Sequence, residues 1–264
     1  MGRLMNSLFI KSAIFHFQTH WSSRAHFWSG VLGMLVNNAL TLLGIWAMLF
    51  AGKPDLDPAR DVFLITNFLL MIGWGVVHVF LGGVTNLDQQ INEGGLDLAL
   101  VTPRAPFLLL SYSKSHLPAW GDVILGLIGI VIYSFYYGPF FFAHSILATA
   151  VSTLSLYAFF LFIGCLAFWF RRTESANSVL LNICLAFNTY PVIDTASGLR
   201  WILFLSPILL AGVIPARAIT NPSLELLGLE IVGGIILFIL VRAFFYLGLK
   251  RYQSNSGMSA QRQN

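Results

Sequence analysis

Long apolar runs separated by short polar stretches dominate the chain. Residues 25–52 and 62–84 contain no Asp, Glu, Lys or Arg, and each is long enough to cross about 30 Å of hydrocarbon as a helix. Residues 53–61, between them, hold charged side chains and two prolines, a composition typical of a short water-exposed loop. The pattern therefore predicts that the first two membrane spans form a helical hairpin.

The second half of the chain predicts four more spans. Residues 123–170 are free of charged side chains. This stretch is about twice as long as one span needs, and the sequence at 136–139 favours a break near its middle, so it predicts the third and fourth spans. Residues 175–193 predict a fifth span, and residues 231–249 a sixth in which Arg242 extends toward the end of the helix.

Three further segments differ from simple spans. Arginine and proline interrupt residues 195–225, which predicts a broken re-entrant segment before the last span. Residues 3–24 place apolar side chains on one helical face, which predicts an amphipathic interfacial helix, with a frayed terminus as the alternative. Residues 251–264 are polar and predict a disordered cytoplasmic tail. We therefore expect an all-α polytopic membrane protein of six transmembrane helices, with residues 1–250 forming a single transmembrane domain.

The composition excludes a soluble globular domain. Hydrophobic residues make up 57% of the chain and charged residues 10%, whereas an ordinary soluble domain carries about 25% charged residues. So few charges would leave large apolar patches exposed to water. The net charge of +4 comes from Lys and Arg scattered between the apolar runs. We interpret them as topology signals, and we expect membrane lipids and no nucleic acid as partners.

The distribution of cations predicts the orientation of the chain. Of its 15 Lys and Arg residues, four fall on one side of the predicted membrane, which leaves eleven on the other. The four are Lys53, Arg60, Arg200 and Arg217. Because cytoplasmic loops carry the excess of Lys and Arg, the side with eleven is expected to be cytoplasmic, and both termini lie there.

The longest predicted cytoplasmic connection covers residues 85–104. Thr85, followed three residues later by Asp88, is typical of a capping box at the start of a helix. Gly94 and Gly95 then favour the end of that helix. We expect a short helix that lies across the cytoplasmic end of the second span.

Three parts of the sequence resemble one family of membrane proteins. They are Glu93-Gly94-Gly95-Leu96-Asp97-Leu98-Ala99-Leu100-Val101-Thr102-Pro103, Tyr190-Pro191-Val192 near the end of the fifth span, and residues 200–215. Together with the predicted spans and termini, they resemble the membrane subunit, or permease, of bacterial type-2 ATP-binding-cassette (ABC) exporters. The resemblance implies a location in the bacterial inner membrane.

The resemblance also implies partners. Two permeases, identical or related, would pair as a homodimer or heterodimer, and each would bind a separate ATP-hydrolysing subunit through residues 85–104. ATP and Mg²⁺ would be bound on that partner, with no cofactor on this chain. The sequence agrees that ATP is bound elsewhere, because it lacks the GxxxxGK[ST] phosphate loop. Its Gly-Lys pair at 52–53 is followed by proline.

Polar and apolar residues of the cytoplasmic loop form the predicted contact with the ATPase subunit. Acidic side chains would lie at the rim of a partner's groove and apolar ones inside it. A solvated connector without a partner is the alternative. The predicted contact residues are Leu87, Asp88, Ile91, Glu93, Gly94, Gly95, Leu96 and Asp97.

Polar residues within the predicted spans are candidates for the substrate pathway, because such residues face protein or water more often than lipid. Simple packing between helices is the competing interpretation. The candidates recur at helical spacing in the second and fifth spans, and they are Asn67, Met71, Trp74, His78, Ser178, Asn182 and Thr189. In the first span, Asn37, Asn38 and Thr41 predict a helix contact that extends across the dimer.

The sequence thus predicts a permease that moves a hydrophobic or amphipathic substrate, either drug-like or lipid-like, and performs no covalent chemistry. An ATP-independent carrier or channel is the alternative, and an intramembrane enzyme is a third class. A proton-coupled mechanism is disfavoured because the carboxylates are expected near span ends. Those carboxylates are Asp122, Asp194, Glu225 and Glu230.

Overall fold

The computed structural model describes residues 24–53, 57–103, 105–170, 178–182 and 207–252. Within these residues the chain is helical and contains no strand. The long helices are α2 (Arg24–Phe50), α3 (Asp57–Phe80), α7 (Trp120–Tyr137), α8 (Pro139–Cys165) and α13 (Leu224–Leu249). The short ones are η2 (Val84–Asn86), α4 (Leu87–Asn92), α5 (Gly95–Leu100), α6 (Pro106–Ser111), η3 (Leu117–Ala119), η4 (Leu166–Phe168), α11 (Pro207–Ala211) and α12 (Val213–Thr220).

The five long helices of the described part are long and apolar enough to cross a membrane. They confirm an all-α membrane protein and correspond to the predicted first, second, third, fourth and sixth spans. The predicted fifth span lies outside the described residues except for 178–182, which are helical. The predicted interfacial helix at 3–24, apart from Arg24, also lies outside them, as does the tail beyond Tyr252.

Two helices begin earlier than the sequence predicted, and each accommodates one buried carboxylate, Asp122 in α7 and Glu230 in α13. Helix α7 begins at Trp120 and includes Asp122, whose carboxylate accepts a hydrogen bond from Asn38. Helix α13 begins at Leu224, and the hydroxyl of Ser223 caps it by accepting a hydrogen bond from the Leu226 amide at 3.2 Å.

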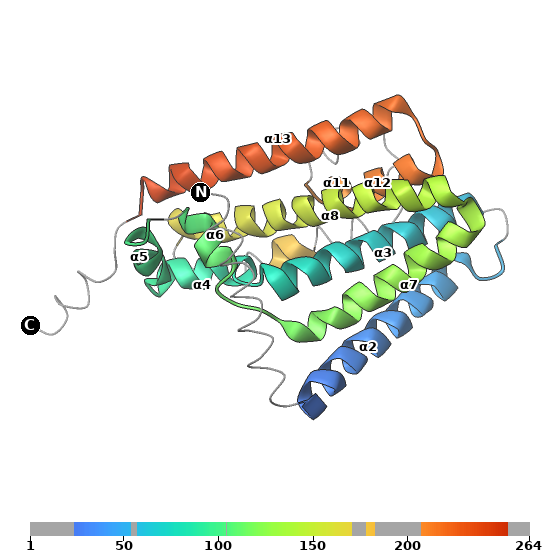
Figure 1. Ribbon diagram of the computed structural model, residues 1–264, viewed down its shortest axis with the longest axis horizontal. Coiled ribbons are helices and arrows are strands. Elements are labelled where there is room, and N and C mark those ends of the chain that lie inside the picture. Colours follow the sequence, from blue (N-terminus) through green and yellow to red (C-terminus); the bar gives the residue numbers. More distant parts are fainter. Residues whose placement is uncertain (1–23, 54–56, 104, 171–177, 183–206, 253–264) are drawn as a thin grey trace, which may run out of the picture.

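Helices α3 and α8 form the centre of the bundle (Figure 1). Helix α7 packs against α3, α2 covers the outer side of α7, and α13 packs against α8 on the opposite side. The close approach of α7 to α3 depends on Gly126, because a Cβ atom there would lie 2.6 Å from the carbonyl oxygen of Phe68. The turn between α7 and α8 depends on Gly138, whose φ of 86° favours glycine, and Pro139 then begins α8.

Two short helices, α11 and α12, occupy the described part of the predicted re-entrant segment. The chain breaks between them at Gly212, and the two prolines do not cause the break. Pro207 begins α11 and Pro215 lies in the first turn of α12, where a missing amide hydrogen is tolerated. Both helices pack against α8 and α13, so protein surrounds this irregular backbone.

Candidate functional site

The loop after α3 folds into successive short helices at one end of the bundle (Figure 1). Helix α4 ends at Asn92, and Gly94 follows with a left-handed φ of 85°. The expected helix end near the glycine pair is therefore confirmed. A second helix, α5, begins at Gly95 and was not predicted from the sequence.

The predicted capping box is wrong. A 3₁₀ turn, η2, precedes α4, and the Thr85 hydroxyl donates to the carbonyl of Gly82 at 2.8 Å. The Asp88 carboxylate accepts from the amide of Gln89 at 2.9 Å. Thr85 therefore lies one residue too early to cap α4, whose N-cap position is held by Asn86.

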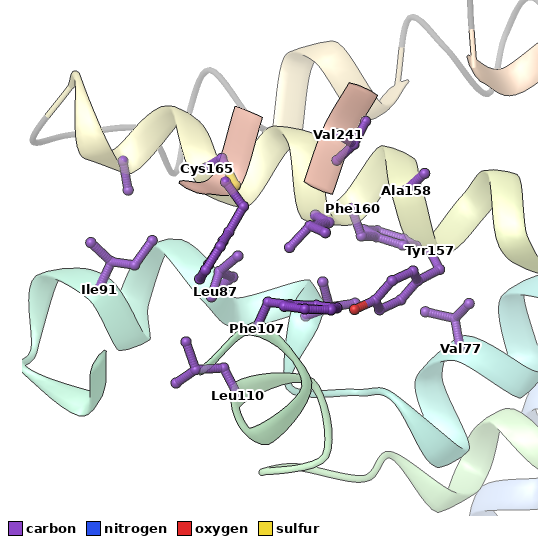
Figure 2. Close-up of a cluster of buried hydrophobic side chains, with 14 of the residues drawn as sticks. Val77, Leu87, Ile91, Phe107, Leu110, Tyr157, Ala158, Phe160, Cys165 and Val241 are labelled. Atoms are coloured by element: carbon purple, nitrogen blue, oxygen red, sulfur yellow. The ribbon is translucent and has the colours of Figure 1, made fainter. Parts of the chain in front are cut away.

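The apolar residues of the predicted ATPase contact are buried in the core of this chain. Leu87, Ile91 and Leu96 are all buried, in a cluster that includes residues of α6, α8 and α13 (Figure 2). Leu87 packs directly on Gly164 of α8, where an added Cβ would lie 2.6 Å from the Cβ of Leu87. These side chains therefore attach the loop to α8 and do not face outward.

The outward face at the end of α5 carries apolar residues that do not belong to the predicted contact set. Leu98 is 72% exposed, and Val101, the residue that follows α5, is 79% exposed. Their spacing of three residues places Leu98 and Val101 on one helical face, opposite Leu96. Since both faces of α5 are apolar, hydrophobicity alone did not distinguish the buried face from the exposed one.

Polar contacts hold the loop against the segment after α6. Gln90 donates to the carbonyl of Gly83 at 2.6 Å and accepts from the hydroxyl of Ser113 at 3.0 Å. Lys114 donates to the side chain of Gln89 at 3.3 Å. The loop is therefore a packed and hydrogen-bonded unit.

The short segment after α13 also reaches this loop. Burial and the nearby carboxylate of Asp97 raise the pKa of Tyr252 to about 12. Tyr252 also makes an edge-on contact with the ring of Phe168, which follows α8. Tyr252 therefore lies beside both the loop, at Asp97, and the segment after α8, at Phe168.

A cavity of about 350 Å³ lies between the loop and the end of α8. One part of its wall is polar and comes from η2 and α4, with Thr85, Asn86, Asp88 and Gln89. Another part is apolar and comes from α8 and residues 178–182, with Phe160, Ile163 and Leu181. Ser178, one of the predicted pathway residues, also lines it.

The other pathway candidates are only partly brought together. Trp74 and His78 stack at 4.6 Å between ring centroids, and the ring of Phe160 lies edge-on to both. Asn67 donates to a carbonyl of its own helix, and Met71 packs toward α2. Exposed Asn182 lies at the end of residues 178–182, and Thr189 lies outside the described residues.

The three dimer candidates on α2 differ in their surroundings. Asn38 donates to Asp122 of the same chain, so that contact joins α2 to α7. Asn37 and Thr41 are exposed, and the Thr41 hydroxyl donates to the carbonyl of Asn37 at 2.8 Å. They lie on a helix face that exposes large apolar residues such as Leu40.

One buried carboxylate lies further inside a span than the sequence pattern predicted. Glu230 is the seventh residue of α13, about 9 Å from the start of the helix. It is completely buried, and its carboxylate lies 3.0 Å from Nε2 of His144 on α8. The expectation that Glu230 lies at a span end is therefore wrong, so the position of the carboxylates no longer disfavours a proton-coupled mechanism.

Comparison with known proteins identifies the family. A family model described as ABC-2 family transporter protein matches residues 35–256. The match covers the loop, the cavity and all five long helices, apart from the first residues of α2. No curated protein matches the chain.

Proposed function

The chain belongs to the ABC-2 transporter family and is the transmembrane subunit of an ABC transporter, and we propose that it works as an ATP-driven exporter. In this proposal a separate subunit binds Mg²⁺ and ATP and hydrolyses the nucleotide. The permease supplies the pathway across the bacterial inner membrane. It exports a hydrophobic or amphipathic substrate, either drug-like or lipid-like.

The packing of the loop after α3 is the observation that carries this proposal. Leu87, Ile91 and Leu96 attach the loop to the core, so a push on the loop reaches α8 without being absorbed by loose backbone. Leu98 and Val101 extend outward and offer an apolar contact to the ATPase subunit. Within the predicted contact set, Glu93 is exposed and suits the rim of that contact.

The mechanism follows from this rigid connection. When ATP draws two ATPase subunits together, each pushes a loop toward the membrane and tilts the α3 and α8 helices of its permease. The tilt shifts the population of the permease pair from a cavity open to the cytoplasm to one open outward. The bound nucleotide supplies the differential affinity that this shift requires.

The arrangement of the helix ends supports a cytoplasmic location for the loop. The start of α2, the short helices α4 to α6 and the end of α13 lie toward one end of the bundle (Figure 1). Both termini would then be cytoplasmic with the loop, as the positive-inside rule predicts.

The exposed face of α2 supports a second permease as partner. An asparagine facing lipid is costly, whereas one facing another helix forms hydrogen bonds. Asn37 and Thr41 would make those contacts across a homodimer or heterodimer, and membrane lipids would cover the remaining apolar surface. If the partner is a second copy of this chain, an Asn37→Cys variant is expected to form a disulfide-linked dimer in membranes. Oxidative cross-linking of that variant tests the homodimer.

The contact with the ATPase subunit is tested by Leu98→Asp. We expect this variant to fold, because Leu98 is exposed, and to lose both co-purification with the ATPase subunit and ATP-driven transport in vesicles. Leu224→Asp is the matched control, since Leu224 is 89% exposed. It is the first residue of α13, which begins at the other end of the bundle. Transport by the purified chain without nucleotide would instead favour the ATP-independent carrier or channel.

A further inference from the structure

Arg242 places a positive charge on the exposed side of the last long helix. It is the nineteenth residue of α13, about 27 Å from the start of the helix, and its side chain is exposed. The hydrocarbon of a bilayer is about 30 Å thick, so a helix that begins at one surface brings Arg242 to the opposite edge of the hydrocarbon. Lys250 follows about 12 Å further along, at the depth of the lipid headgroups.

Two aromatic rings hold the guanidinium of Arg242. Its central carbon lies 5.6 Å from the ring centroid of Phe107 on α6 and 5.9 Å from that of Tyr246, one turn further along α13. Aromatic faces attract a cation at these distances. The guanidinium also has five N–H donors, and it makes no ion pair with a described residue. The rings therefore position a charge that still needs an anionic acceptor.

The other charges at this end of the helix are mainly positive. Lys250 and Arg251 directly follow α13, are exposed, and form no ion pair within the described part of the chain. One carboxylate, that of Asp97, lies beside the end of the described chain, and with Arg242 the cations outnumber it three to one. Residues 253–264 contain no Asp or Glu. This end of α13 therefore attracts an anion.

The apolar side chains next to Arg242 favour a lipid as the source of that anion. Ile239 and Ile235 are exposed and lie one and two turns before Arg242 on the same helical face. An acyl chain along them would place its headgroup beside Arg242 and Lys250. Helix α13 lies on the opposite side of the bundle from α2, the proposed contact of the second permease (Figure 1). That pairing leaves α13 open to lipid.

We infer that Arg242 and Lys250 bind the phosphate of an anionic phospholipid, whose acyl chains lie along Ile239 and Ile235. The planar guanidinium donates to two phosphate oxygens, and the ammonium of Lys250 adds a second cation. The bound lipid holds α6 against α13, because Arg242 rests on Phe107 of α6. The site names the class of membrane lipid that the proposed function leaves open, and lipid binding requires no ATPase subunit.

Two phospholipids with identical acyl chains and different headgroup charge test the site. Dioleoyl phosphatidylglycerol or dioleoyl phosphatidylcholine is titrated onto the purified full chain in neutral detergent, and bound lipids are counted by native mass spectrometry. Both lipids carry a phosphate, but choline neutralises its charge. We expect saturable binding of phosphatidylglycerol at about tenfold lower concentration. Equal affinities would overturn the role of charge, and displacement by an equal concentration of soluble glycerol 3-phosphate would overturn the assignment to a lipid.

Three variants at exposed positions locate the site. Arg242→Gln is expected to weaken phosphatidylglycerol binding at least tenfold, and Lys250→Gln about fivefold. Lys53→Gln is the matched control, because it removes the same charge after α2, at the other end of the bundle, and it is expected to leave binding unchanged. Unchanged binding in Arg242→Gln or in Lys250→Gln would show that the lipid binds elsewhere and would overturn the inference.

Thermal unfolding gives a second readout. A ligand that binds only the folded state stabilises it, so phosphatidylglycerol is expected to raise the unfolding midpoint of the unmodified chain and to have little effect on Arg242→Gln. An equal rise in both proteins would overturn the site. Because neither readout involves nucleotide, failure of the lipid site leaves the proposed exporter standing. Conversely, failure to find an ATPase subunit leaves the lipid site standing.

Discussion

The buried pair of His144 and Glu230 is expected to contribute strongly to the stability of the protein. Loss of His144 is expected to cost more than loss of Glu230. Both side chains are buried between α8 and α13, and their nearest polar atoms are 3.0 Å apart. Each also has one buried polar atom without a hydrogen-bond partner in the described structure, Nδ1 of His144 and Oε1 of Glu230. Each group therefore depends on the other for its one polar contact in this part of the bundle.

The expected free energies follow from that dependence. His144→Leu leaves a carboxylate buried without its partner, and breaking a buried pair in this way costs about 3 to 5 kcal/mol. Glu230→Met leaves a neutral imidazole unsatisfied, which costs about 1 to 3 kcal/mol. The double variant removes both polar groups, so its stability should lie within about 1 kcal/mol of the unmodified protein.

The assay is reversible unfolding of the purified protein in mixed micelles, followed by helical circular dichroism. The four proteins form a double-mutant cycle, which isolates the energy of the pair. Unfolding free energies that simply add in the double variant would refute the reasoning. An average hydrogen bond between membrane helices, about 0.6 kcal/mol, would then describe the contact better.

Two further changes test how the helices pack. Gly164→Ala should destabilise the protein by about 1 to 3 kcal/mol, because the added Cβ meets Leu87, and it should speed proteolysis of the loop after α3. Gly33→Ala, where nothing lies within 4 Å, is the control, and equal effects of the two changes would contradict this account. Asn38→Ala should cost about 1 to 3 kcal/mol by removing the hydrogen bond to buried Asp122. A thermal unfolding midpoint equal to that of the unmodified protein would contradict that expectation.

Local sequence was sufficient to predict the helical hairpin, the break near Gly138 and the helix end near Gly94. Each depends on a property of a few consecutive residues, namely the length of an uncharged run or a backbone conformation that favours glycine. The start of α13 was predicted too late, because Glu230 was taken as a boundary. A buried partner on α8 allows that carboxylate to lie inside the helix.

The candidate site was predicted only in part. The loop after α3 was identified, and Ser178 does line the cavity beside it. The burial of Leu96 and the exposure of Leu98 were not predicted, although the two residues are both leucines and lie two positions apart. Nor did the sequence indicate that Asn38 finds its partner in Asp122 of the same chain.

The amino-acid sequence alone was enough to establish that the chain crosses a membrane, where most of its helices lie, and that it contains no GxxxxGK[ST] phosphate loop. The folded structure was needed to show which side of each helix faces the core and which polar groups contact one another. The physical reason is that lipid and protein interior are equally apolar. A membrane helix therefore lacks the polar face by which a soluble helix reveals its orientation.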